Sequence, residues 1–270
     1  MPRLDSKLML SPAPDTETSL SYHDDHPPAI IPLTTTTTEI VDEKTAVITT
    51  PAEEALPYWL INVPRSQWPS ECPEYLRNLP PKSIKTLSTP DAQYERQNWE
   101  LVKEIVGSNQ IHLLQRVPSE LRRYLAYIAK IKEVYGSVLD FVVQKRLGWV
   151  DDLKPRGTRP FSHTDDIKIL YNDWPYGVEK DIVHLVIWTK FELEDDPATD
   201  DLTPRMRREI DEFVEKTFRC RMPAEKVIWF KNWKSLKSVH AIEHFHVMLY
   251  QPDPVFLHEI TNGDVPVTDV

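Results

Sequence analysis

Three histidines are spaced like residues of one strand face near the C-terminal end of the sequence, in the stretch 238–250, SVHAIEHFHVMLY. Successive side chains of a β-strand leave opposite faces, so an unbroken strand places His240, His244 and His246 on one face and Phe245 on the other. A buried neutral imidazole needs hydrogen-bond partners, and clustered titratable groups are typical of functional sites. We therefore treat this strand as the candidate site.

Two chemistries fit a His-x-His pair. An imidazole can attack a phosphorus atom as a nucleophile, or it can bind a metal ion together with a carboxylate and a further histidine. The metal alternative fits less well, because the position four residues beyond His246 is Tyr250, and because we expect His258 and Glu259 in a flexible polar tail. We predict no metal ion and no cofactor. A binding protein without catalysis is the third possibility.

Composition narrows the class of protein. Residues 1–55 hold ten acidic and three basic residues, a net charge of −7, which leaves −3 of the total of −10 for the rest of the chain. We expect this segment, rich in Pro, Thr and Ser, to be a disordered acidic tail. The remainder lacks the basic surface that nucleic acids require. The N-terminus of the chain lacks the features of a signal peptide, and no run of about 20 apolar residues occurs, so we expect no membrane partner and a location in the cytoplasm and also in the nucleus.

Glycine and cysteine usage exclude several kinds of site. Six glycines stand against 24 prolines, and neither G-x-G-x-x-G nor G-x-x-x-x-G-K occurs, so Rossmann and P-loop phosphate sites are excluded. The two cysteines, Cys72 and Cys220, form no C-x-x-C pattern and suggest neither a disulfide framework nor a zinc site.

The elements that must position the histidines follow from the periodicity of the apolar residues. Residues 56–150 predict a helical and irregular wrap, with helices at 94–106, 119–135 and 139–147. Residues 151–252 predict strands at 167–171, 182–191, 226–232 and 242–250, with an amphipathic helix capped by Thr203 at 204–218. We expect a single α+β domain over 56–270, with flanking helices on an antiparallel sheet.

Four sequence words lie between residues 153 and 250: LKP at 153–155, KILYNDWPYG at 168–177, VIWFKNW at 227–233 and EHFHV at 243–247. Taken together they resemble the fungal N-acetylglucosamine-induced protein family. The family name reports induction by an amino sugar and implies no reaction. The resemblance implies a protein that takes part in an amino-sugar response.

A second set of residues occurs in a characteristic order: Asn172, Pro175-Tyr176, the strand HLVIWTK at 184–190, a helix, and then the His-x-His strand. This order resembles the histidine-triad superfamily of nucleotidyl hydrolases and transferases. The resemblance implies a histidine-triad-like core over 151–252 and attack of a neutral imidazole on the α-phosphorus of a nucleotide. It also implies a covalent phosphoramidate that water or a second substrate resolves.

The chain departs from the triad pattern in two places. One histidine is missing, so the nucleophile is His244 if Ile242 takes the first triad position, and His246 if Met248 takes the third. The glycine- and glutamine-containing phosphate loop is also missing. In its place stand Lys237, which can bind phosphate as a point charge, and Ser238, which can donate a hydrogen bond.

These observations predict that the protein binds a small phosphorylated ligand, a nucleotide or a nucleotide sugar, with His244 and His246 as catalytic residues. The predicted ligand-binding residues are Asn172, His184, Lys190, Asn232, Lys237, Ser238 and His240. Trp174 and Trp233 lie in predicted turns and are candidates for stacking a base or sugar. We assign Asp165, Asp166 and Asp173 to solvated loops. Whether the site catalyses, and the oligomeric state, stay open.

Overall fold

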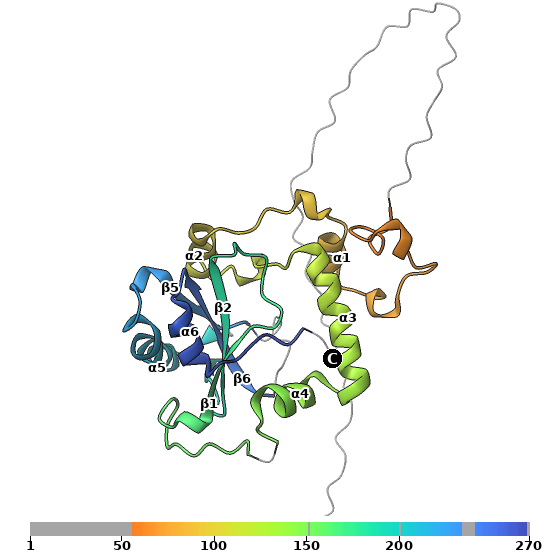
Figure 1. Cartoon of the computed structure of the whole chain (residues 1–270). Coiled ribbons are helices and arrows are strands. Elements are labelled where there is room, and N and C mark those ends of the chain that lie inside the picture. Colours follow the sequence, from red (N-terminus) through yellow and green to blue (C-terminus); the bar gives the residue numbers. More distant parts are fainter. Residues whose placement is uncertain (1–55, 151, 200, 234–240, 269–270) are drawn as a thin grey trace, which may run out of the picture. The chain divides into compact units, whose positions relative to one another are not determined.

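The protein is built around a four-stranded antiparallel sheet, seen in a computed structural model that describes residues 56–150, 152–199, 201–233 and 241–268 (Figure 1). The strand order is β1-β2-β6-β5, so the two long strands lie at the centre. The predicted α+β class with an antiparallel sheet is confirmed. The predicted disordered tail, residues 1–55, lies outside the described residues.

The strands match the predicted ones closely. They are β1 Ile167–Tyr171, β2 Ile182–Thr189, β5 Val227–Phe230 and β6 Glu243–Tyr250, with a separate two-stranded ribbon of β3 Asp195–Asp196 and β4 Asp201–Leu202. β2 and β5 are shorter than predicted: Phe191 and Asn232 lie beyond the last paired residues.

The register of the central strands fixes the position of each histidine. On β6, His246 lies opposite Val186 of β2 and Phe230 of β5, and His244 lies opposite Trp188. His184 of β2 lies opposite Met248. Because faces alternate along a strand, these three histidines share one face of the sheet.

Six α-helices surround the sheet within the described ranges. They are α1 Pro81–Leu87, α2 Trp99–Gly107, α3 Pro118–Tyr135, α4 Val138–Phe141, α5 Pro204–Val214 and α6 Pro254–Thr261. π-Helical turns extend α4 over Val142–Leu147 and α5 over Glu215–Arg219. Short 3-10 helices occur at Arg65–Gln67, Glu74–Leu76, Asp91–Gln93, Ile111–Leu113, Thr164–Asp166 and Ala224–Lys226. No helix in these ranges has both the length and the apolar character needed to span a membrane.

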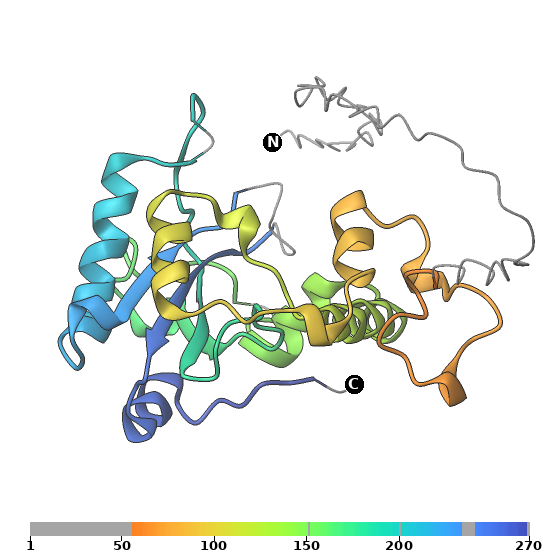
Figure 2. The same cartoon turned by 90° about the horizontal axis from the view of Figure 1, so that it is seen from above.

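Two groups of helices cover the two faces of the sheet, as Figures 1 and 2 show. α5 and α6 pack against the face that carries Leu185, Phe245 and Val247. α3 and α4 pack against the opposite face, beside Val186 and Trp188. The face that carries the histidines is therefore the one that α3 covers.

Local sequence accounts for the ends of two helices. The Thr203 hydroxyl accepts a hydrogen bond from the Met206 backbone N–H at 3.2 Å, which confirms the predicted cap of α5. α3 begins at Pro118, with its fixed φ at the first helical position, rather than at a Ser119 cap. It ends at Gly136, whose φ of +83° is typical of a terminating glycine.

The prediction of a flexible polar tail after β6 is wrong. Residues 254–261 form α6, with Asp253 accepting hydrogen bonds from the backbone N–H groups of Val255 and Phe256 at 2.8 and 3.0 Å. Phe256 and Leu257 are buried against the sheet. The helix is only eight residues long, with Phe256, Leu257 and Ile260 as the residues that pack on the core, and this span is too short to give a clear helical period, which explains the error.

Candidate functional site

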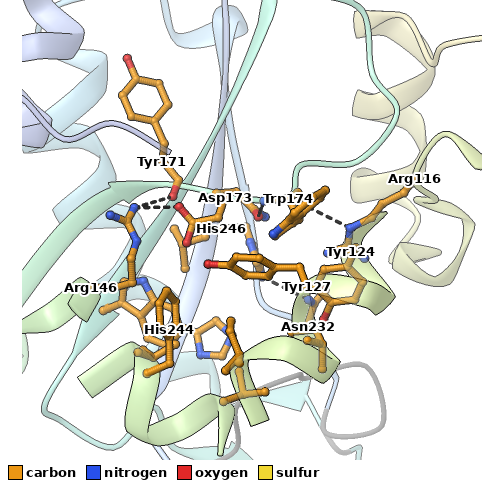
Figure 3. A pocket seen from close by; sticks show the side chains of 18 of the residues that line it. Arg116, Tyr124, Tyr127, Arg146, Tyr171, Asp173, Trp174, Asn232, His244 and His246 are labelled. Atoms are coloured by element: carbon orange, nitrogen blue, oxygen red, sulfur yellow. Dashed lines mark hydrogen bonds and ion pairs between the residues drawn. The ribbon is translucent and has the colours of Figure 1, made fainter. Parts of the chain in front are cut away.

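A cavity of about 160 Å³ lies between α3 and the histidine face of the sheet (Figure 3). Its wall is rich in aromatic rings, contributed by α3, by the segment that follows β1, and by β2. The polar residues of the wall are Arg116, Arg146, Asn172, Asp173, Asn232, His244 and His246, and its aromatic residues are Tyr124, Tyr127, Phe141, Tyr171, Trp174, Tyr176 and Trp188.

His246 is held by protein groups at both ring nitrogens. The Asn232 amide group lies 3.1 Å from Nε2 and can only donate there, so the proton of the neutral ring lies on Nδ1. His246 then donates from Nδ1 to Nε2 of His184 at 3.0 Å. The Phe230 ring stacks on His246 with centroids 5.0 Å apart, and the Tyr176 ring stacks on His184 at 5.2 Å. The stacked Phe230 ring and the hydrogen bonds at both nitrogens fix the orientation of the His246 imidazole.

His244 has a defined tautomer as well. Its Nδ1 lies 3.0 Å from the backbone oxygen of Ile242, an atom that can only accept, so Nδ1 carries a proton, and in the neutral form of the ring Nε2 carries the lone pair. The ring lies 4.4 Å from the Trp188 ring, centroid to centroid. A neutral imidazole with its lone pair on Nε2 has the form that a nucleophile or a hydrogen-bond acceptor needs.

Burial keeps two of these histidines neutral. It lowers the pKa of His184 to about 3, with a further contribution from the positive charge of Arg116. The pKa of His246 also lies well below its ordinary value, first because of burial and then because of the neighbouring His184 and His244. At neutral pH these rings therefore act through hydrogen bonds and not as cations.

Arg116 supplies a positive charge at the cavity. Its Nε donates to the backbone oxygen of Trp174 at 2.9 Å, and the guanidinium carbon lies 4.0 Å from the centroid of the Tyr124 ring. No carboxylate in the described part of the chain forms an ion pair with it. Figure 3 shows the Arg116 side chain beside Trp174 and Tyr124. An anionic ligand group at this point would meet a cation whose charge is not neutralised by a salt bridge.

Arg146 is neutralised by two carboxylates. It lies 2.8 Å from Asp264 and 3.0 Å from Asp173, and 7% of its side chain is exposed. Burial raises the pKa of Asp173 to about 6, although the Val267 N–H and Arg146 oppose the shift. The π-helical turn at Val142–Leu147 carries Arg146 into this position. The pair Arg146 and Asp173 forms a polar part of the wall, and together with Asp264 the three groups carry one more negative than positive charge when both carboxylates are ionised.

Comparison with known families shows to which family the chain belongs. The profile of DUF3605, described as a protein of unknown function, matches residues 98–250, which include both central strands and the cavity wall from Arg116 onward. The chain belongs to the DUF3605 family.

Relatives of this DUF3605 chain occur in fungi. N-acetylglucosamine-induced protein 1 of Candida albicans is 29% identical over 184 residues, covering 61% of the chain and 72% of the relative. An uncharacterised protein of Saccharomyces cerevisiae is 30% identical over 169 residues, covering 60% and 84%. The crystal structure of HTC1 superposes with a TM-score of 0.51 at 26% identity, covering 62% of this chain and 96% of that one. The resemblance to N-acetylglucosamine-induced proteins is confirmed, and the histidine-triad resemblance stays a prediction.

The structure brings together some of the predicted site residues of this DUF3605 chain. His244, His246, Asn172 and Asn232 all line the cavity. His184 does not line the cavity itself and lies behind the wall, where it contacts the lining residues His246, Asn172 and Tyr176.

Lys190 lies elsewhere. Its ammonium group is buried 3.0 Å from Asp152 and 3.9 Å from Asp166, and it does not line the cavity. It stands six residues beyond His184, which in a strand is about 20 Å. Lys237, Ser238 and His240 lie outside the described residues.

The assignment of Asp166 and Asp173 to solvated loops is wrong. Asp166 is fully buried and accepts hydrogen bonds from the backbone N–H groups of Arg156 and Gly157. Asp173 faces Arg146 with 18% of its side chain exposed. Asp165 is half exposed, as expected of a loop residue.

The sequence analysis singled out Trp174 among the rings of the wall but neither of its two arginines, Arg116 and Arg146. Three residues of α3, Tyr124, Ile128 and Ile131, pack in the core and also line the cavity. Arg116 belongs to no recognisable sequence motif. The sequence shows it only as a charged residue two positions after the apolar pair at 113–114. Among the residues that the structure describes, no group of three or more His, Cys, Asp or Glu side chains is placed to hold a metal ion.

Proposed function

We propose that the cavity binds a phosphorylated ligand, a nucleotide or a nucleotide sugar, and that His244 acts on its phosphorus in the manner of the histidine-triad superfamily. The observation that carries this proposal is the tautomer of His244, with Nδ1 hydrogen-bonded to Ile242 and the lone pair on Nε2, in the wall of a cavity that also contains the unneutralised charge of Arg116.

We choose His244 over His246 because its Nδ1 hydrogen bond to the Ile242 backbone oxygen orients the ring in the cavity wall. Both nitrogens of His246 are engaged by Asn232 and His184, and attack by His246 would break one of these bonds in a buried place. In the proposed step, Nε2 of His244 forms a bond to phosphorus as the bond from phosphorus to the leaving oxygen breaks. Water or a second substrate then displaces the imidazole and takes the phosphorus group. Arg116 offsets charge on the phosphate oxygens.

The biological setting comes from the relative in Candida albicans, whose name states that it is induced by N-acetylglucosamine. We infer that this chain acts in an amino-sugar response. Nucleotide sugars and sugar phosphates are then the first ligands to test.

The test is incubation of the purified protein with a panel of nucleotides, nucleotide sugars and sugar phosphates. Thermal shift reports binding, and intact-protein mass spectrometry reports a phosphorus-containing adduct. His244→Asn is the sharp variant, because an asparagine amide can take the place of Nδ1 in the bond to Ile242 while it removes Nε2. We expect this variant to keep its fold and to lose the adduct and any turnover.

His258→Asn is the matched control, since His258 is exposed on α6, on the other side of the sheet from the cavity. The control should form the adduct as the unaltered protein does. Turnover that persists in His244→Asn and in His246→Ala would show that neither histidine is the nucleophile.

Binding without turnover is the second candidate function. It is favoured by the engagement of both His246 nitrogens by protein side chains, because this arrangement fits a structural role in the wall better than attack on phosphorus. A ligand that shifts the melting temperature but yields neither adduct nor product would assign the cavity to a receptor role.

A further inference from the structure

Two buried polar atoms of the cavity wall have no hydrogen-bond partner within the described chain. One is the indole Nε1 of Trp174, a donor, and the other is the amide Oδ1 of Asn232, an acceptor. Such atoms are uncommon in native proteins, because a buried polar atom without a partner has lost its hydrogen bonds to water and gained none in return. Both residues line the same cavity, so one ligand can satisfy both atoms.

The volume of the cavity limits what it can enclose. At about 160 Å³ it is smaller than the roughly 300–1,000 Å³ of pockets that bury a drug-sized molecule. A whole nucleotide does not fit inside it, whereas a single ring does. The other parts of a larger ligand must then lie outside the enclosed space.

The wall selects among single rings. Tyr127, Trp174 and Trp188 contribute aromatic rings to the wall, and an apolar face of a ligand ring packs well against such rings. A ligand that pairs with both Trp174 Nε1 and Asn232 Oδ1 must accept at one position and donate at another. A sugar hydroxyl does both, so a ring with several hydroxyls meets this demand in any rotation. Arg116 adds a site for an anion.

We propose that the cavity holds the sugar ring of a phosphorylated sugar, with the phosphate bound by Arg116. This inference rests on the proposed function, because it names the part of the phosphorylated ligand that is enclosed. The source of the sugar phosphate is a sugar monophosphate or a nucleotide sugar, and in the second case the nucleotide lies outside the cavity.

Calorimetry with four probes tests the assignment: N-acetylglucosamine 1-phosphate, UDP-N-acetylglucosamine, UDP and N-acetylglucosamine. We expect the two sugar phosphates to bind at least tenfold more tightly than UDP or the neutral sugar. Equal affinity of the two sugar phosphates identifies a monophosphate ligand, and tighter binding of the UDP-sugar identifies a nucleotide sugar.

UDP that binds as tightly as the UDP-sugar would overturn the inference and leave the proposed function standing. The neutral sugar binding as tightly as its phosphate would overturn the inference too. If none of the four probes binds, and no other nucleotide or sugar phosphate does, the proposed function fails with it.

Trp174→Phe tests the unpaired donor. The variant keeps an aromatic ring and loses an N–H that bonds to nothing in the described part of the unliganded protein, so we expect the unfolding midpoint to fall only by the loss of buried ring volume, and by less than in Trp99→Phe, which also loses a hydrogen bond. The affinity for the sugar phosphate should fall about tenfold, the loss of one hydrogen bond. Unchanged affinity would contradict the assignment of Trp174 to the ligand.

Trp99→Phe is the matched control. Trp99 is as buried as Trp174, but its Nε1 donates to the backbone oxygen of Glu225 at 3.1 Å, away from the cavity. This variant should lower the unfolding midpoint and keep the affinity for the sugar phosphate. Comparison of the two variants therefore distinguishes a tryptophan N–H whose hydrogen bond stabilises the fold from one that is available to a ligand.

Arg116→Met tests the anion site. We expect affinity for the sugar phosphate to fall to that of the neutral sugar, and affinity for the neutral sugar to stay unchanged. Arg65→Met is the control. Arg65 lies over the Trp68 ring on the surface, so this substitution removes an equal charge and a cation–π contact outside the cavity. A preference for the phosphorylated sugar that survives Arg116→Met would overturn the assignment of Arg116.

Discussion

At the scale of single residues, two carboxylates share the Arg146 guanidinium and are held in different ways. Asp264 accepts from both terminal nitrogens of Arg146, at 2.8 and 2.9 Å, and from the Tyr171 backbone N–H at 2.9 Å. Asp173 meets the same guanidinium at one oxygen, which also accepts from the Val267 N–H. Desolvation is therefore well compensated at Asp264 and poorly compensated at Asp173.

The pKa of Asp173 predicts a pH-dependent difference in stability. Its folded value of about 6 lies above the unfolded value of about 3.9, so between these values the folded state binds more protons and stability falls as pH rises. The Asp173→Asn variant has no carboxyl group at this position, so its stability does not fall with pH for this reason. We expect the variant to gain about 2–3 kcal/mol over the unaltered protein between pH 4 and pH 7, measured by urea unfolding at each pH.

Asp264→Asn is the comparison for that experiment. It removes the charge that pairs with a buried guanidinium, so it should lower the free energy of unfolding at pH 7 by about 1.5–3 kcal/mol. A constant difference between Asp173→Asn and the unaltered protein from pH 4 to pH 7 would contradict the raised pKa.

The residue scale also shows where sequence reasoning reaches its limit. The period-two spacing of His244 and His246 was sufficient to place both on the cavity face, because a strand has only two faces. The position of the Lys190 ammonium group could not be predicted from the sequence HLVIWTK at 184–190. Lys190 follows the end of a strand, and its long side chain is directed by Asp152 and Asp166. Arg116 contacts Trp174 and Asp173 contacts Arg146, and these contacts between residues far apart in the sequence could not be predicted from it.

At the scale of elements, one face of β6 carries core residues that stabilise the fold and the other face carries the residues of the proposed binding site. Phe245 is fully buried on the face opposite His244 and His246, where its ring contacts Phe161, Phe213 and others below α5. Because the strand is a thin layer with two faces, changes on one face leave side chains on the other face largely in place.

Phe245→Leu tests this separation. We expect the free energy of unfolding to fall by about 1–3 kcal/mol, as is usual for the loss of buried aromatic contacts, with the affinity of the folded protein for a sugar phosphate unchanged. Urea unfolding and calorimetry on the same sample measure the two quantities. A tenfold loss of affinity would show that the two faces are coupled.

Elements with strong periodicity were predictable and the others were not. α5 and the four strands of the main sheet carry clear periods of 3.6 and 2 with recognisable ends, and they occur close to where the sequence predicts them. The π-helical turn at Val142–Leu147 reads as an ordinary helix, because one extra residue in a turn barely alters the apolar pattern. That extra residue rotates Arg146 relative to the turn before it, so its place in the wall could not be predicted.

At the scale of the whole molecule, the cavity is assembled from segments that are far apart in the sequence. α3 contributes Tyr124 and Tyr127, the segment after β1 contributes Asn172 to Tyr176, and β6 contributes the histidines. α5 lies on the other face of the sheet and contributes no residue to this wall. A ligand that binds all of these segments stabilises them together, since it binds the folded state and not the opened ones.

Hydrogen–deuterium exchange with and without a saturating sugar phosphate measures this coupling. We expect slower exchange in α3, in the π-helical turn at Val142–Leu147 and in residues 171–176, because these segments form the wall on the side of the sheet where the ligand enters. Exchange in α5 should stay unchanged at short times, since its opening does not release the ligand. Trp174→Phe at the same ligand concentration should show weaker protection in the same three segments. Protection that appears first in α5 would place the ligand on the opposite face of the sheet, where the groove beside Arg207 and Trp229 would become the site to study.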